Sequence, residues 1–426
     1  MAGREGMGRS GMRQPAPDEI PAFIRSVRVP FLDPFGAGEV DEPWVARTAA
    51  RLESDRAWVV VDDDRFVANS CIYSMNVTVP SASGEANCPT LPMGGVSAVG
   101  VHPTHRRRGH LTAMMTAMLD DCRRRGEPLA GLIASESTIY GRFGFGSATD
   151  AVTATIDKRR AVMARPPAVP PLRLLEPEEA LEVLPGLFDR LRRGRPGQVD
   201  MHPTRWADLV AGDRPGGRDG FSRPFFAVGE DGCALYRARE RSGGEGEELS
   251  VLYLGGSSAE VEAGLWRFLF EVDLVERVVA PHRPVDDPLR WRLADPRQLR
   301  IDGLEDRLHL RVLDMVAAFE PRGYRSSDRI VIEVEPPAVD CGGDDGVVGR
   351  WVLEAGPEGA SCRRARPAEG ADLRLGVAAL GSLYLGGHPA TLLAGAGLVE
   401  PGTRGALGAA DRLLTSRPAP ATAFGF

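Results

Sequence analysis

A basic, glycine-containing turn between an apolar strand and an amphipathic helix most constrains the fold of this chain. Residues 96–101 form an apolar, β-branched run, and Arg106-Arg107-Arg108-Gly109 follows it. The apolar residues of the next segment recur at the i, i+3, i+4 and i+7 spacing of one buried helix face. A second apolar run follows at residues 129–134. The order strand, helix, strand predicts a parallel pair of strands in an α/β domain.

The turn itself has the composition of an anion-binding site. Backbone N–H groups of such a turn and of the helix N-terminus form a cradle for an anion. The three arginines add charge that a pyrophosphate would neutralise, and Gly109 lets the backbone approach a ligand closely. The alternative is a solvated basic turn that caps the helix. The flanking strand and the segment at residues 134–146 favour the binding site.

The residues around the turn resemble the coenzyme A signature of the GNAT superfamily of N-acetyltransferases, in which Arg-x-x-Gly follows a Val-x-Val strand. The resemblance implies that the strand splays from its neighbour and that its main-chain groups pair with the pantetheine arm of acetyl-CoA. Leu111 stands where Gly or Ala is usual in the superfamily. The cofactor contacts implied by the resemblance are Val99, Gly100, Val101, Arg107, Arg108, Gly109, His110, Leu111, Thr112, Ser135 and Glu136.

Residues 103–109 and 134–146 resemble one group within that superfamily, the enhanced intracellular survival (Eis) family of aminoglycoside-type acetyltransferases. The likeness continues at residues 233–237, 265–267, 315–324, 381–386 and 422–426, so it covers nearly all of the chain after the first twenty residues. It implies tandem GNAT-like α/β domains followed by a sterol-carrier-protein-like α+β domain. It also implies a homohexamer.

The length of 426 residues fits three domains, since one domain usually has about 150 residues. Consecutive prolines at residues 165–172 predict an extended linker before the second domain. We expect a flexible tail at 1–20, the GNAT domain with the acetyl-CoA site at 21–158, a second GNAT-like domain at 159–300 and the sterol-carrier-like domain at 301–426.

Local patterns predict further elements. An acidic turn at residues 62–64 between two apolar runs predicts a hairpin of strands 57–61 and 65–73, and a Gly/Glu-rich run at 242–248 predicts another hairpin loop. The remaining predicted strands are 225–228, 234–239, 249–254, 330–334, 350–354 and 371–375. The remaining predicted helices are 177–193, 259–272, 312–319, 377–383 and 406–414.

The Eis resemblance also implies two catalytic groups. In that family a tyrosine protonates the departing coenzyme A thiolate, and the match places it at Tyr140; a phenol with a pKa of about 10 suits this leaving group. The base of the family is the terminal carboxylate, which maps onto Phe426. An exposed terminal carboxylate has a pKa of about 3.5 and would need burial or a bridging water to accept a proton from an ammonium. The alternatives are a tyrosine that only packs beside Phe143 and Phe145, and a frayed chain end.

The resemblance places the amine pocket at Phe31, Asp33 and Trp44. Gly425 replaces a penultimate acidic residue that helps the family hold polycations, so we do not assume that aminoglycosides are the natural substrates. The expected acceptor is a small-molecule or peptide amine. The alternative function is a noncatalytic acyl-CoA-binding or lipid-carrier protein whose third domain carries the activity.

Composition excludes several other classes. A net charge of −7 argues against nucleic-acid binding, which requires a basic surface. The apolar runs are far shorter than the about 20 residues that cross a bilayer, and the first twenty residues contain no apolar signal-peptide core. We therefore expect a cytoplasmic protein without a membrane partner. Six cysteines without metal-ligand spacing predict reduced thiols and no metal; His102 and His105 lie beside three arginines that would repel a cation.

Overall fold

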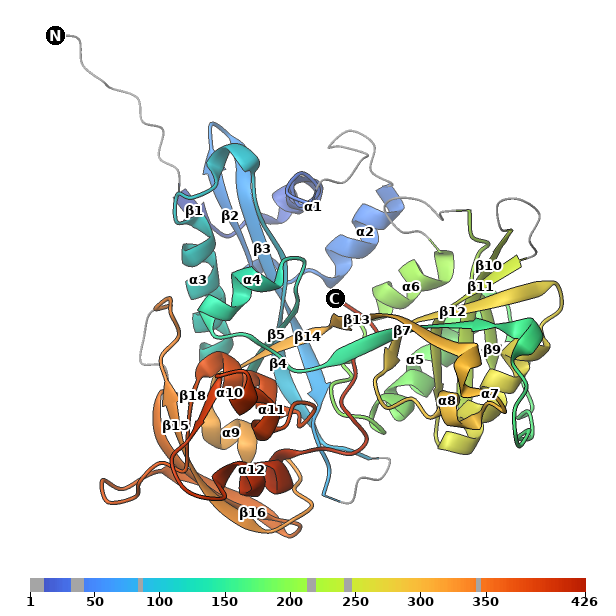
Figure 1. The fold of residues 1–426 in the computed structure, drawn as a ribbon. Coiled ribbons are helices and arrows are strands. Elements are labelled where there is room, and N and C mark those ends of the chain that lie inside the picture. Colours follow the sequence, from blue (N-terminus) through green and yellow to red (C-terminus); the bar gives the residue numbers. More distant parts are fainter. Residues whose placement is uncertain (1–10, 32–41, 83–86, 213–219, 241–246, 342–345) are drawn as a thin grey trace.

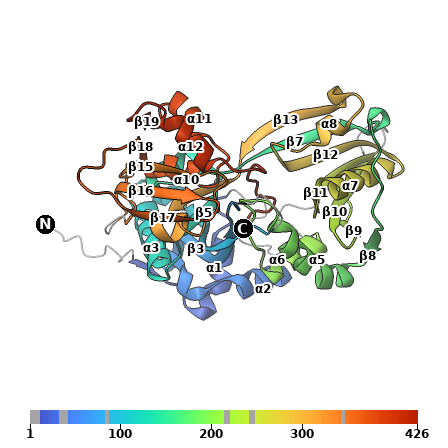
Figure 2. The same ribbon diagram turned by 90° about the horizontal axis from the view of Figure 1, so that it is seen from below.

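The computed structural model describes residues 11–31, 42–82, 87–212, 220–240, 247–341 and 346–426. Three β-sheets organise these residues into three modules, named here in the order in which their sheets begin (Figure 1). The first and third modules pack together, and the second lies beside them. The C-terminus ends between the first and second modules (Figures 1 and 2).

The sheet of the first module has the order β1-β2-β3-β4-β5-β14-β6. Helix α3 packs against β3 and β4, and β4 and β5, which flank it in sequence, pair in parallel as predicted. The predicted hairpin is also confirmed, because β2 and β3 are antiparallel. The strands are β1 (Gly11–Arg13), β2 (Ala57–Asp62), β3 (Arg65–Thr78), β4 (Thr90–Val101), β5 (Leu129–Ile133), β6 (Gly146–Ser147) and β14 (Leu308–Val312), and the helices are α1 (Ile20–Ser26), α2 (Glu42–Arg51), α3 (His110–Arg124) and α4 (Ser137–Tyr140).

The sheet of the second module has the order β13-β7-β12-β11-β10-β9-β8. Strands β11 and β12 pair in parallel around α7, and β10 and β11 form the predicted antiparallel hairpin, whose residues 241–246 lie outside the described part. The strands are β7 (Asp150–Asp157), β8 (Arg173–Leu175), β9 (Phe225–Val228), β10 (Gly232–Glu240), β11 (Glu247–Gly256), β12 (Val275–Pro284) and β13 (Leu299–Asp306), and the helices are α5 (Pro177–Arg192), α6 (Pro203–Ala211), α7 (Ala259–Glu271) and α8 (Leu289–Arg292).

The third module is a five-stranded sheet of order β17-β16-β15-β18-β19 with helices on one face. Its α9 begins later than the helix predicted at 312–319, because the side chain of Asp314 caps it by accepting a hydrogen bond from the N–H of Ala317 at 2.9 Å. The strands are β15 (Asp328–Glu335), β16 (Gly349–Gly356), β17 (Gly359–Arg364), β18 (Leu373–Gly376) and β19 (Val399–Pro401), and the helices are α9 (Met315–Phe319), α10 (Val377–Tyr384), α11 (Ala390–Gly395) and α12 (Ala406–Leu414).

Two strands cross the boundaries expected from the sequence. β7 lies inside the expected domain 21–158 but pairs with β12 and β13 of the second sheet. β14 lies inside the expected domain 301–426 but pairs with β5 and β6 of the first sheet. The proline-rich segment 165–172 therefore runs within the second module, where Nη1 of Arg267 on α7 donates to Pro167 O at 2.8 Å.

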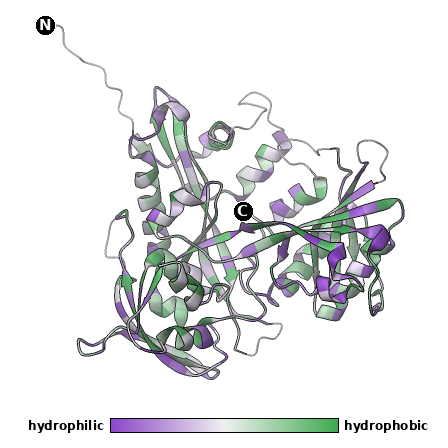
Figure 3. Ribbon diagram, in the orientation of Figure 1, coloured by the Kyte–Doolittle hydropathy of each residue, from purple (hydrophilic) through white to green (hydrophobic). Residues whose placement is uncertain are grey.

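The first and third modules share a hydrophobic core. Buried side chains of β4, β5 and β14 contact those of β15, β16, α10 and α12 in one continuous cluster. Figure 3 shows hydrophobic residues on the strands and helices that face one another and hydrophilic residues toward the outside. This shared core fixes the third module, and with it the chain that leads to the C-terminus, against the first sheet.

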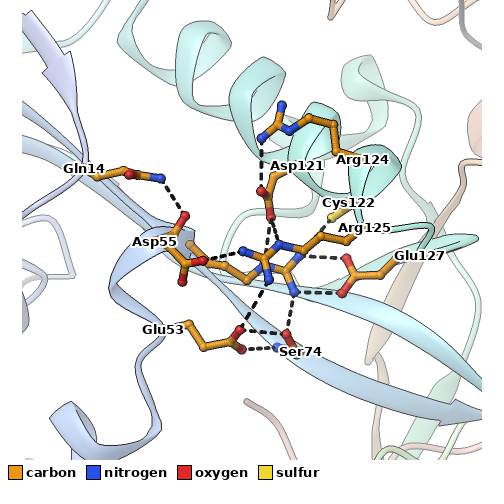
Figure 4. Close-up of polar contacts among 10 residues, drawn as sticks. Gln14, Glu53, Asp55, Ser74, Asp121, Cys122, Arg124, Arg125 and Glu127 are labelled. Atoms are coloured by element: carbon orange, nitrogen blue, oxygen red, sulfur yellow. Dashed lines mark hydrogen bonds and ion pairs between the residues drawn. The ribbon is translucent and has the colours of Figure 1, made fainter.

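A buried arginine ties α3 to the first sheet. Arg56, just before β2, is fully buried, and its guanidinium donates to both carboxylate oxygens of Glu127 at 2.7 Å and to Asp121 of α3 at 2.9 Å. It also donates to the Ser74 hydroxyl of β3 at 2.7 Å. Asp121 on α3, Ser74 on β3 and Glu127 in the segment between α3 and β5, all labelled in Figure 4, converge on this guanidinium. Bidentate, charge-assisted hydrogen bonds of this kind fix orientation as well as distance.

Candidate active site

Strands β4 and β5 form a cleft because they pair over only part of their length. The parallel ladder joins residues 93–95 to residues 129–131. β4 then continues to Val101 without a ladder partner on β5 in the described structure, while β14 pairs with the other edge of β5 along its whole length. This is the splayed strand that the sequence resemblance implies. The backbone groups on this side of β4 are thereby available to a ligand.

A bulge redirects β4 inside this cleft. The ladder between β3 and β4 shifts register near Asn69 and Ser97, and Ala98 has a φ of 53°, which is uncommon for a residue with a Cβ. The side-chain amide of Asn69 donates to Ala98 O and holds this conformation. Bulges re-aim the residues that follow them. The bulge at Ala98 separates Ser97 and Ala98, which line one cavity, from residues 99–101, which line another.

The first cavity, called here the turn cavity, has a volume of about 450 Å³ and includes the basic turn. Arg106, the first arginine of the predicted anion-binding turn, also lines it, as do His105, Pro30, Ile139 and Arg142, which were not predicted. Arg108 is the predicted residue that does not line it; its Nη2 donates to Thr104 O at 3.2 Å instead. The predicted cofactor residues that the cavity brings together are Val99, Gly100, Val101, Arg107, Gly109, His110, Leu111, Thr112, Ser135 and Glu136.

The turn places the N-terminus of α3 at this cavity. Gly109 is the N-cap residue with a φ of 84°, and Arg107 has a φ of 63°. The left-handed backbone conformation at residue 109 therefore explains the glycine better than a close approach of the backbone to a ligand does. Burial, aided by Arg108 and His105, lowers the pKa of His110. A neutral His110 leaves the backbone N–H groups of the helix start and the neighbouring arginines as the positive groups of the site.

Tyr140 lines the same cavity at the C-terminal end of α4. Its ring is buried and packs edge-on against Phe145, with 6.4 Å between the ring centroids. Tyr140 thus packs beside Phe145, as the alternative interpretation expects, and also lines the cavity. Burial raises the pKa of the Tyr140 hydroxyl, and the Glu136 carboxylate raises it further. Tyr140 therefore keeps its proton at neutral pH.

The second cavity, called here the C-terminal cavity, has a volume of about 510 Å³ and lies between α1, α2, residues 199–205 of the second module and the chain end. Phe31 lines both cavities, and Trp44 lines this one. Asp33 lies outside the described residues. Among the described residues, two acidic side chains line the cavity, and both accept hydrogen bonds from β3: Glu53 from Ser74 and Asp200 from Asn76.

The last residue reaches the point where β4 and β5 separate. Ser97 Oγ donates to the terminal oxygen of Phe426 at 3.0 Å, and Nη2 of Arg205 donates to Gly425 O at 3.0 Å. A Cβ on Gly95 of β4 would lie 3.0 Å from Cε2 of the Phe426 ring, so glycine makes room for this ring. The chain end is held in place and half-buried. Ser97, Arg205 and Gly95 were missed by sequence reasoning, since each contact joins segments distant in the chain.

The described residues show no group of His, Cys, Asp and Glu side chains suited to a metal ion. His105 instead contacts Asp62 at 2.9 Å. Among the helices of the described part, none is long and apolar enough to span a bilayer. The six cysteines are buried, and in the described structure none of them forms a disulfide.

Known proteins resemble this chain along its length. Models of acetyltransferase (GNAT) domains match residues 12–148 and 197–312, and a sterol carrier protein domain matches residues 315–423. N-acetyltransferase Eis of Mycobacterium tuberculosis is 34% identical, with 97% of this chain and 98% of that one covered. An uncharacterized N-acetyltransferase of Streptomyces coelicolor is 38% identical, with 84% and 87% covered.

Solved structures agree. Eis1 from Mycobacterium abscessus superimposes with a TM-score of 0.83 at 30% identity and covers 98% of this chain and 100% of its own. A GCN5-related N-acetyltransferase from Anabaena variabilis shares the fold, with a TM-score of 0.79 at 18% identity and the same coverage. The chain therefore belongs to the Eis family of GNAT-type N-acetyltransferases, with tandem GNAT domains followed by a sterol-carrier-protein-like domain.

Proposed function

We propose that this acyltransferase moves the acetyl group of acetyl-CoA to a primary amine by direct attack, with Tyr140 as general acid and the Phe426 carboxylate as general base. One observation carries the proposal: the two groups line adjacent cavities that share Phe31 and that follow each other along β4, from Ala98 to Val99. A donor in one cavity and an amine in the other would meet at the bulge.

The turn cavity fits acetyl-CoA, the co-substrate of GNAT acetyltransferases. The N-terminus of α3 and the arginines of the turn suit a pyrophosphate. The unpaired side of β4 at residues 99–101 suits the amide groups of pantetheine, which need backbone partners in extended geometry. This arrangement would bring the thioester sulfur toward Tyr140.

The chain's own groups then supply the proton transfers. The Phe426 carboxylate accepts a proton from the acceptor ammonium, directly or through a water, and Ser97 orients one carboxylate oxygen. The amine nitrogen attacks the thioester carbonyl carbon, and the carbon–sulfur bond breaks. Tyr140 gives its proton to the leaving sulfur and regains one from the nitrogen of the new amide through solvent. Coenzyme A and an acetamide leave, and one proton is released.

The test is release of coenzyme A thiol from acetyl-CoA with polyamines, aminoglycosides and lysine peptides as acceptors. Tyr140→Phe should lower kcat about 100-fold while acetyl-CoA binding is retained, since general acid catalysis contributes about that much. Tyr236→Phe, in the second module, is the matched control and should keep wild-type turnover. Equal turnover of Tyr140→Phe and wild type would remove the acid role.

The base is tested by adding residues after Phe426, which moves the carboxylate out of the site. Undiminished turnover of the extended chain would contradict the assignment. The noncatalytic lipid-carrier alternative has less support. Relatives over the whole length are named N-acetyltransferases, and large side chains such as Phe319, Tyr324 and Tyr384 fill the core of the third module.

A further inference from the structure

We propose that the second module is a clamp for the chain's own C-terminus: it has the strand layout of a cofactor cleft, but it uses that cleft to hold residues 419–425 and so positions the Phe426 carboxylate. The inference rests on the proposed function, because it gives that carboxylate its fixed position. It assigns a role to a module that supplies neither the turn cavity nor Tyr140.

The second module repeats the cleft geometry of the first. β11 and β12 pair in parallel only over residues 247–250 and 275–279 and then separate, and α7 follows β11 as α3 follows β4. Residues of both separated ends line a small cavity together with Ala421 and Ala423 of the C-terminal tail. The tail thus lies at the position that corresponds to the cofactor cleft of the first module.

Buried charges make this second cleft unsuitable for a nucleotide cofactor. Arg283 of β12 donates to Leu254 O of β11 at 2.7 Å and to Asp287 at 2.7 Å, so it uses a backbone acceptor inside the cleft. Glu262 of α7 lies 3.6 Å from Arg283. Glu260 and Glu262 stand in the first turn of α7, whereas the first module has three arginines in the turn just before α3. Carboxylates there would repel a pyrophosphate.

Hydrogen bonds from the second module hold five of the residues 419–425, and Thr422 Oγ1 also lies 3.1 Å from Oγ1 of Thr149, which precedes β7. The backbone of residue 419 contacts both Asp286 and Arg195, and Arg205 contacts the residue before the chain end. The bonds are Ala419 N to Asp286 at 2.8 Å, Arg195 to Ala419 O at 2.7 Å, Ala421 N to Pro196 O at 2.9 Å, Thr422 Oγ1 to Gly197 O at 2.7 Å, Ala423 N to Gln198 Oε1 at 3.2 Å and Arg205 to Gly425 O at 3.0 Å.

An aromatic box anchors the tail two residues before its end. The ring of Phe424 lies 5.4 Å from Phe188, 6.0 Å from Trp206 and 5.4 Å from Tyr253, measured between centroids. Such packing removes rotational freedom from the last residues before substrate binds. Because two residues span about 7 Å at most, an anchored Phe424 confines the carboxylate of Phe426 to the neighbourhood of Ser97.

The clamp is tested by carboxypeptidase A, which removes accessible C-terminal aromatic residues, with mass spectrometry as the readout. Full-length wild type should resist digestion. Phe424→Ala and Arg205→Gln should lose the terminal residue quickly, and Phe424→Tyr should regain resistance. Phe225→Ala is the matched control, since it removes an exposed aromatic ring from β9 of the same module; it should behave as wild type.

Turnover of the same undigested variants gives the second readout. Phe424→Ala should lower kcat on the order of tenfold with unchanged acetyl-CoA Kd, less than the about 100-fold effect of removing a general base. A tail that stays resistant in both Phe424→Ala and Arg205→Gln overturns the clamp, whatever the activity. A digestible tail with unchanged kcat overturns the positioning role. Activity of the wild type itself is measured separately, so failure of the proposed function is recognised independently.

Discussion

At the scale of single residues, buried charged side chains fix the elements that line the two cavities. Arg56 is buried with Glu127 and Asp121 around it, and this cluster joins the end of α3 to β2 and β3. Because the start of α3 lines the turn cavity, the orientation of the whole helix matters to the proposed site. The cluster therefore fixes the position of α3 relative to the sheet.

Glu127→Gln is expected to destabilise the protein by about 3 kcal/mol, because removing one partner leaves a buried guanidinium incompletely neutralised. The amide keeps the volume of the carboxylate, so the loss reports on charge and hydrogen bonding. A shift of the urea midpoint, followed by circular dichroism, measures it. Asp55→Asn, which breaks an ion pair with Arg125 at an exposed carboxylate, should cost less than about 1 kcal/mol. Equal shifts of the urea midpoint for both variants would contradict the larger stabilisation assigned to the buried ion pair of Arg56 and Glu127.

The His388 imidazole gives a pH dependence of stability. Its hydrogen bond to the Asp150 carboxylate at 3.0 Å raises the pKa of His388 above its ordinary value of 6.5. The folded state therefore binds the proton more tightly, so this stability is fully present below pH 6.5 and is lost as pH rises through the raised pKa. His388→Gln should lower the urea midpoint at a pH of about 5.5 and match wild type at about 8.5. A pH-independent difference would exclude the linkage.

At the scale of elements, β4 is the strand on which both cavities depend. It pairs with β5 over three residues, separates from β5 after Gly95 and bulges at Ala98. Gly95 marks the last paired position, and Phe426 lies against it. One strand thus sets the distance between the turn cavity and the C-terminal carboxylate.

Gly95→Ala should reduce kcat and leave acetyl-CoA binding unchanged. A Cβ there would lie 2.5 Å from Sδ of Met75 and 3.0 Å from the Phe426 ring, so the ring and its carboxylate must move while residues 99–101 stay in place. Steady-state kinetics and a binding titration measure the two effects. Gly11→Ala in β1 is the control, because a Cβ there has no atom within 4 Å. A weakened acetyl-CoA affinity with normal kcat would contradict the prediction that Gly95 affects the position of Phe426 and not acetyl-CoA binding.

Sequence reasoning predicted the elements whose cause is local. The apolar spacing of α3 and the acidic hairpin turn each depend on residues close in the chain. The placement of β7 and β14 was not predicted, since each strand joins its sheet through pairing with distant segments. For the same reason Phe426 and Tyr140 were proposed only through family resemblance, and the contacts of Ser97 and Arg205 with the chain end had no local signal.

At the scale of the whole molecule, the modules cooperate through the C-terminal tail. The third module packs on the first through a shared core, and its chain then crosses to the second module before it ends beside β4. The second module holds this tail, and the first supplies the cavity that the tail's end lines. None of the three modules would form the proposed site alone.

We propose that the molecule also associates into the homohexamer expected of its family. β13 is an edge strand that pairs on one side with β7, and Ile301 and Leu304 on it are 54% and 68% exposed. Nearby in the chain, Trp291 is 76% exposed. Unpaired strand edges with exposed apolar side chains favour association with another copy.

Light scattering after size exclusion should therefore give a mass of about six times 45.8 kDa. Changing Ile301 and Leu304 together to arginine should produce smaller species, because charges on the edge strand oppose pairing. Leu392→Arg, on α11 of the third module, changes a residue that is similarly exposed at 58% and should keep the wild-type mass. A monomeric wild type would contradict the hexamer. An arginine double variant that keeps the full mass would show that the assembly uses a surface other than β13.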